Sequence, residues 1–178
     1  FANITSPLTK IIQFLILFVW IEIYFYYSHR LLHKPKLFWI HRQHHQGNLL
    51  NPWTSLSFSV LERLILLFGA SFIPAIVSFW FPLSFQIYVG YFFMNYVLNV
   101  HGHLNVETYP VGFVKSVFGK IWNTTTYHTL HHMRYKGHYG LFTSILDRYH
   151  GTWFADYEAV HERSCTKDDA SPLVGVTQ

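Results

Sequence analysis

Apolar residues fall in long uninterrupted blocks along this 178-residue chain. The first block covers residues 8–27 and contains only two charged side chains, Lys10 and Glu22. About 20 mostly apolar residues are enough to cross a bilayer as a helix. A buried helix of a soluble protein is the alternative, but this block is apolar on every side and has no polar stripe. The pattern therefore favours insertion into a membrane.

The second block covers residues 56–100 and is too long for a single span. Two prolines, Pro74 and Pro82, bracket an aromatic stretch near its middle. Proline interrupts helices, and aromatic side chains favour the membrane interface. We therefore predict a helical hairpin with helices at about 56–73 and 83–100. A single kinked, partly re-entrant element is the alternative.

Basic residues lie in the polar segments that follow the two apolar blocks. They are Arg30, Lys34, Lys36, Arg42, Lys115, Lys120, Arg134, Lys136 and Arg148. A hairpin returns the chain to the side it left, so both segments lie on one face, which the positive-inside rule makes cytoplasmic. The predicted fold is an all-α integral membrane protein with about three transmembrane helices and a cytoplasmic helical cap.

Composition narrows the class of protein further. Aromatic residues make up 20% of the chain, which excludes a disordered protein, and the single cysteine, Cys165, excludes a disulfide scaffold. We expect one membrane domain over residues 1–163 and a polar, disordered tail over 164–178. Because the chain starts at Phe1, almost directly before the first apolar block, we also expect that upstream sequence is missing.

Histidine is unusually frequent, with 13 residues, and 11 of them fall in the windows 29–45, 101–103 and 128–138. None lies within an apolar block, and all three windows map to the same predicted face. The spacing H-x-x-x-H occurs at His29 and His33, and H-x-x-H-H occurs at 41–45 and again at 128–132. Residues three and four apart share one face of a helix, and imidazole is a common ligand of transition metals.

Several kinds of site are compatible with a histidine-rich cap. A metal-free basic surface loop leaves the repeated spacing unexplained, and a structural zinc site needs only four ligands, often thiolates. A carboxylate-type di-iron bundle would show two Glu-x-x-His pairs, whereas the sequence contains one, Glu158 and His161, outside the histidine windows. Two metal ions would use eight or more ligands, so the pattern favours a two-metal site.

The quoted boxes, together with their flanks, resemble the fatty acid hydroxylase/sterol desaturase superfamily. The segments SHRLLHKPKLFWIHRQHHQ, HLNVETYP and NTTTYHTLHHMRYKGHYGLFTSILDRYHGT carry the resemblance, which covers about residues 24–153. Members are membrane oxidoreductases with a histidine-ligated di-iron centre that use O2. The resemblance implies nine metal ligands: His29, His33, His41, His44, His45, His103, His128, His131 and His132.

Four further residues stand near these motifs. His101 and His138 are candidates for additional ligands or for hydrogen-bond partners of ligands. Asn99, four residues before His103, is a candidate to orient that ring or a bound water. Asp147 is a candidate to anchor the cap by hydrogen bonds to ligating imidazoles, and a plain surface ion pair with Arg148 is the alternative. We expect His150 and His161 to be ordinary surface residues.

The resemblance also implies the reaction and its partners. We expect hydroxylation or desaturation of a membrane lipid, a sterol or a fatty acyl chain, at two iron ions. The sequence has no nucleotide-binding loop, so electrons would come from a cytochrome b5 or ferredoxin type of partner. No nucleic-acid partner is expected, and the membrane would be the endoplasmic reticulum or a bacterial inner membrane. The alternatives are a metal-free lipid-binding relative and, more remotely, a metal transporter.

Overall fold

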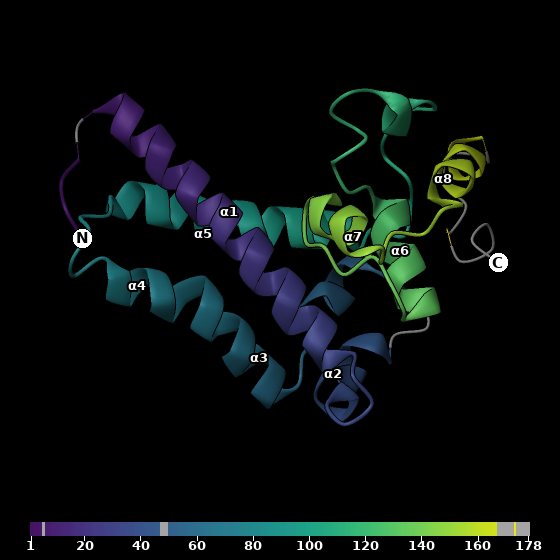
Figure 1. Cartoon of the computed structure of the whole chain (residues 1–178), viewed down its shortest axis with the longest axis horizontal. Helices are drawn as coiled ribbons and strands as arrows, with labels where there is room; N and C mark the ends of the chain where they lie inside the picture. Colours follow the sequence, from purple (N-terminus) through teal and green to yellow (C-terminus); the bar gives the residue numbers. More distant parts are fainter. Residues whose placement is uncertain (5, 47–49, 167–172, 174–178) are drawn as a thin grey trace.

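The computed structural model describes residues 1–4, 6–46, 50–166 and 173, and the regular elements in that part of the chain are all helices. Two isolated bridges are the only extended pairings among these residues. The three long helical segments make up one end of the structure, and most of the shorter helices gather at the other end (Figure 1). The predicted all-α class is confirmed.

The first long helix is α1 (Pro7–Leu32), which matches the first apolar block. Ser6 accepts a hydrogen bond from the N–H of Thr9, and Pro7 occupies the first turn, where a missing N–H costs nothing. Many of its apolar side chains are exposed, including Leu8 at 66% and Ile16 at 62%. A soluble core helix would bury such a surface, so this exposure indicates a lipid environment.

The second long segment runs from Val60 to Val77 through α3 (Val60–Leu67), a π-helical turn η2 (Phe68–Phe72) and α4 (Ile73–Val77). The expected helix end at Pro74 is therefore wrong. Within the π turn the N–H of Ile73 donates to the carbonyl of Phe68, a wider spacing than in an α-helix. This wider turn carries the chain past a proline that would interrupt a regular helix.

The π turn packs closely against α1. The Nε1–H of Trp20 donates to Gly69 O at 2.9 Å, and the hydroxyl of Tyr24 donates to Ile65 O at 2.7 Å. A Cβ at Gly69 would come within 1.9 Å of the Tyr24 ring, so only glycine fits this contact. The side chains of α1 thus provide donors for carbonyls near the irregular turn.

The third long helix is α5 (Phe85–Gly102), which follows an exposed aromatic turn at residues 79–81. The predicted hairpin is confirmed. Of the described helices, α1 and the segment Val60–Val77 are long and apolar enough to cross a membrane. Only 17% of the apolar 18-residue stretch in each of them is buried. Two of the roughly three predicted spans thus have structural support, while spanning by α5 stays a prediction.

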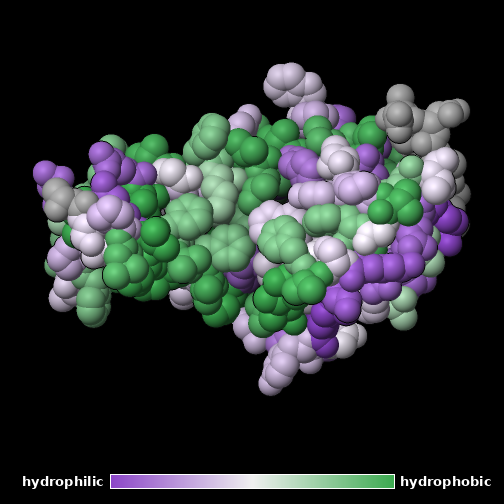
Figure 2. Space-filling model, turned by 90° about the horizontal axis from the view of Figure 1, so that it is seen from above, coloured by the Kyte–Doolittle hydropathy of each residue, from purple (hydrophilic) through white to green (hydrophobic). Residues whose placement is uncertain are grey.

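The shorter elements form a cap at the far end of the long helices. They are α2 (Phe38–His45), η1 (Pro52–Leu56), η3 (Phe113–Lys115), α6 (Thr125–Arg134), α7 (Ile145–His150) and α8 (Tyr157–Cys165). Hydrophobic residues cover most of the long-helix end in Figure 2, and hydrophilic residues gather at the cap. This polarity suits a membrane-associated protein with a polar cap.

The predicted disordered tail, residues 164–178, does not begin where we expected. Helix α8 includes Ser164 and Cys165, the first two residues of the predicted tail. Residues 167–172 and 174–178 lie outside the described part of the chain, and so does most of that prediction.

Candidate metal centre

Nine histidines converge where α1, α2, α5 and α6 meet, and they form two groups. One comprises His29, His33, His41, His45 and His131, and the other comprises His44, His103, His128 and His132. Within each group the candidate ligand atoms all lie within 4.8 Å of one another. We call them the five-histidine group and the four-histidine group. Together they contain all nine residues that the motifs single out.

The two groups are direct neighbours because α2 and α6 each contribute to both. On α2, His41 and His45 belong to one group while His44 belongs to the other. The rings of His45 and His132 bring the groups within 4.4 Å, measured between centroids. A repeated H-x-x-H-H spacing thus places imidazoles on both sides of a shared boundary.

The hydrogen bonds of the outer nitrogens fix how several rings point. Nδ1–H of His29 donates to Tyr139 O at 2.9 Å, and Nδ1–H of His131 donates to Gly137 O at 2.8 Å. In the same way, the Nδ1–H of His103 donates to Asn99 O at 2.8 Å. A neutral imidazole that donates from Nδ1 carries a lone pair on Nε2. These rings therefore point lone pairs at the centre of their group.

Glu62 performs the same task for His41. The Nδ1–H of His41 donates to Glu62 Oε1, and both side chains are almost fully buried. Glu62 belongs to α3, 21 residues away along the chain, and the sequence offers no spacing that links the two. In the sequence, the one sign that Glu62 has a buried partner is its position as an acid within an apolar segment.

The inner nitrogens of two rings lie at hydrogen-bond distance from each other, yet neither nitrogen carries a proton that it could donate. His29 Nε2 lies 3.1 Å from His41 Nε2, although both rings donate from Nδ1. His131 Nε2 is buried and has no hydrogen-bond partner. Lone pairs that face one another repel, and a buried unpaired acceptor is costly. A cation bound between these nitrogens would remove both penalties, so the donor set fits a metal ion in each group.

Burial also keeps these rings in the form that binds metals. Removal from water lowers the pKa of His33 to about 2, that of His45 to about 3 and that of His103 to about 4. The pKa values of His128 and His132 are lowered well below the usual value, again mainly by burial. The rings outside the long helices are therefore neutral at neutral pH, as ligation requires.

Both groups border one pocket. His29, His41, His44, His103 and His128 line its polar end. Phe25 of α1, Leu66 of α3 and Leu98 of α5 contribute apolar lining from the three long helical segments. An apolar pocket with a few convergent polar groups is typical of a small-molecule site.

The additional candidates lie outside both groups. The Nε2 of His101 hydrogen-bonds with Thr108 Oγ1 at 2.7 Å. His138 is fully buried, stacks on Tyr127, donates from Nδ1 to Tyr127 O, and accepts at Nε2 from the N–H of Phe154. Asn99 meets His103 through its backbone carbonyl, while its side chain donates to Ser55 O.

Asp147 anchors the cap, through backbone rather than through imidazoles. Its Oδ1 accepts from Tyr139 N–H and Thr152 Oγ1, and its Oδ2 accepts from Gly140 N–H and Tyr127 OH. Glu22 of α1 holds the same stretch further along, by accepting from the N–H groups of residues 142 and 143. Asp147 and Glu22 thus fix the loop 139–143, and the carbonyl of Tyr139 in this loop orients His29.

Substituting Asp147→Asn should lower the free energy of unfolding by about 2–4 kcal/mol, because an amide cannot satisfy four buried donors. Thermal unfolding in detergent measures the change. Asp156→Asn is the matched control, since Asp156 is exposed and forms a surface ion pair with Arg134. We expect the control to cost less than about 1 kcal/mol. Equal effects would contradict the anchoring role.

Of the two histidines that we expected on the surface, one is fully buried and the other is partly exposed. His161 is fully buried, because α8 turns this residue and Val160 toward α6. His150 is partly buried, stacks on Tyr26 and hydrogen-bonds with the hydroxyl of Tyr27. Neither lies in a histidine group of the described residues. Helical packing within the cap, which the sequence pattern does not specify, explains both differences.

Comparison with known proteins places these features in a family. The sequence model of the fatty acid hydroxylase family matches residues 14–152. The chain is 32% identical to the very-long-chain aldehyde decarbonylase GL1-1 of Oryza sativa subsp. indica, over 83% of this chain and 24% of that protein. It is 28% identical to the Delta(7)-sterol 5(6)-desaturase erg3A of Aspergillus fumigatus, over 92% and 44%.

A Delta(7)-sterol-C5(6)-desaturase of Nicotiana tabacum is 27% identical, over 85% of this chain and 54% of that protein. The chain thus spans between about a quarter and about half of the length of these relatives. No solved structure matches it significantly. The matched region contains all nine clustered histidines, and the chain belongs to the fatty acid hydroxylase family.

Proposed function

We propose that this chain forms the catalytic part of a membrane oxidoreductase that uses O2 to oxidise a C–H bond of a lipid at two iron ions. The observation that carries the proposal is the convergence of nine imidazoles, seven of them buried, in two adjacent groups beside an apolar pocket. All-nitrogen ligation suits a borderline metal such as iron. Homologous oxidoreductases, the sterol desaturases, share the family.

The five-histidine group would hold one ion and the four-histidine group the other. When bound, the iron ions would supply the redox chemistry that an unactivated C–H bond needs and that acid–base side chains lack. Four electrons reduce O2 to two waters. In a desaturation two of them come from the substrate and two from an external donor, for which we propose a cytochrome b5 or ferredoxin type of partner.

The residues of the chain would bind the substrate, orient the metal ligands and exclude water from the site. Phe25, Leu66 and Leu98 would hold an apolar substrate, which would reach the pocket laterally from the bilayer between the long helices. The carbonyls of residues 99, 137 and 139 keep ligand rings in position. Orientation of the cap toward the cytoplasm, inferred from the basic segments, is part of this proposal.

The reaction can be tested with two probes taken from the relatives, a Delta(7)-sterol and a very-long-chain aldehyde. Purified protein is loaded with ferrous iron and given a reducing partner, and mass spectrometry follows the products. We expect oxygen consumption that depends on one of these lipids and a product that has lost two hydrogens or gained one oxygen. Iron-loaded protein that oxidises neither lipid class would contradict the proposed substrates.

A further inference from the structure

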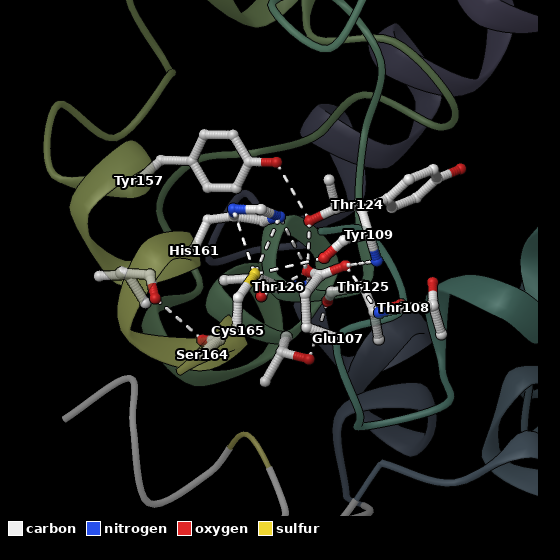
Figure 3. A network of polar contacts seen from close by, with 12 residues as sticks. Glu107, Thr108, Tyr109, Thr124, Thr125, Thr126, Tyr157, His161, Ser164 and Cys165 are labelled. Carbon is white, nitrogen blue, oxygen red and sulfur yellow. Dashed lines mark hydrogen bonds and ion pairs between the residues drawn. The ribbon is translucent and has the colours of Figure 1, made fainter. Parts of the chain in front are cut away.

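Glu107 lies at the centre of a buried polar network that joins the start of α6 to α8 (Figure 3). Its side chain is only 1% exposed. Its Oε1 accepts from the N–H groups of Thr108 and Tyr109 at 2.9 and 3.0 Å. Its Oε2 accepts from Thr124 Oγ1 at 2.7 Å and from both Thr126 N–H and Thr126 Oγ1, at 3.0 and 2.6 Å. Five donors thus meet one buried carboxylate.

These bonds fasten the start of α6 to the segment that follows α5. The first N–H groups of a helix have no carbonyl partner within the helix, and Thr124 provides no side-chain cap for them. Glu107 accepts one of these N–H groups from 19 residues away, where a carboxylate also favours the positive end of the helix. A second link joins the hydroxyl of Thr125 to His101 O at 3.3 Å.

The four-histidine group depends on this junction more than the other group does. His103 follows α5, and His128 and His132 lie on α6, so three of its four members come from the joined elements. The rings of His103 and His128 are 4.3 Å apart between centroids. The five-histidine group takes only His131 from α6, and that ring is held separately by Gly137 O.

Helix α8 covers the carboxylate from the other side. His161 Nε2 lies 3.7 Å from Glu107 Oε2, too far for a hydrogen bond, and the Cys165 Sγ–H donates to Tyr109 O at 3.3 Å. Burial raises the pKa of the Cys165 thiol to about 11, so the thiol stays protonated. Tyr157 OH donates to Thr124 Oγ1 at 3.1 Å. These side chains close the network against water, which strengthens its hydrogen bonds.

We propose that Glu107 is a positioning residue for the four-histidine group, and that its loss weakens metal binding there while sparing the five-histidine group. The proposal rests on the two-metal function proposed above. The effect is selective because Glu107 holds the junction from which only the four-histidine group draws most of its ligands. Changes to partners of this kind typically cost about 10- to 100-fold in metal affinity.

The test is a titration of chelator-treated protein with Fe²⁺ under anaerobic conditions, with the wild type and Glu107→Gln compared. We expect two ions per wild-type chain, and in the variant one ion bound as before and one bound about 10- to 100-fold more weakly. Circular dichroism checks that the helices persist. Glu162→Gln is the control, since Glu162 of α8 forms an ion pair with the exposed Lys115, and we expect this variant to leave both ions unaffected.

Thr126→Val removes only one donor to Glu107 and keeps the test decisive if Glu107→Gln does not fold. We expect it to weaken one ion and to spare the other. Two unaffected ions in a folded variant, or equal weakening of both, would overturn the positioning role. A wild type that binds fewer than two ions would instead contradict the underlying two-metal proposal.

Discussion

Replacing His131 or His132 by alanine is expected to abolish turnover and to remove one iron ion in each case. His131 belongs to the five-histidine group and His132 to the four-histidine group, so adjacent residues of one helix report on different ions. Removing one member of a catalytic unit commonly costs at least about 10³-fold in rate. Turnover and iron per chain should therefore fall together in both variants, and the double variant should bind almost no iron.

The matched control is His150→Ala. His150 lies outside both groups, on α7, and its ring contacts Tyr26 and Tyr27. We expect iron content and turnover close to wild type. His161 was expected on the surface and would then have served as a control. It is unsuitable, because it is fully buried beside Glu107. Full iron content in either His131→Ala or His132→Ala would show that the ligand assignment is wrong.

The metal-free protein is expected to lose stability steeply as the pH falls from about 6.5 to 4. Burial lowers the pKa of His33, His45 and His103 to about 2, 3 and 4, while an unfolded chain keeps values near 6.5. Between these limits the unfolded state binds protons that the folded state does not. Each such histidine lowers the free energy of unfolding by about 1.4 kcal/mol for every pH unit in this range, so the three together lower it by about 4 kcal/mol per pH unit.

Thermal unfolding of chelator-treated protein in detergent between pH 7.5 and 4.5 measures this slope. His138→Asn tests the cause, because His138 lies outside both groups and burial lowers its pKa to about 3. The variant should show a shallower loss of stability over the same range. A melting temperature that does not change with pH would contradict the neutral, buried state of these rings.

The apolar blocks predicted most of the architecture, and the histidine spacing together with the family resemblance predicted the members of the histidine groups. Both signals are local, because block length predicts long helices and three- or four-residue spacing predicts a shared face. Pro74 was misjudged because a π turn carries the helix past it, and that turn depends on contacts with Trp20 and Tyr24 from another helix. Such tertiary compensation leaves no pattern in the local sequence.

The residues that orient the ligands were harder to identify. Glu62 meets His41 across 21 residues, and Glu22 meets Thr143 across 121. Asp147 was considered for contacts with imidazoles, yet it binds the backbone that in turn orients His29. These partners are brought together only by the packing of the cap onto the long helices. An acid in an apolar stretch indicates that a buried partner exists but does not identify it.

The proposed reaction requires that the two histidine groups hold two iron ions. Elemental analysis of detergent-purified protein, prepared without chelators and with ferrous iron available, tests it most directly. We expect two iron ions per wild-type chain and one in each of His131→Ala and His132→Ala. One metal ion or none in well-folded wild-type protein would contradict the account.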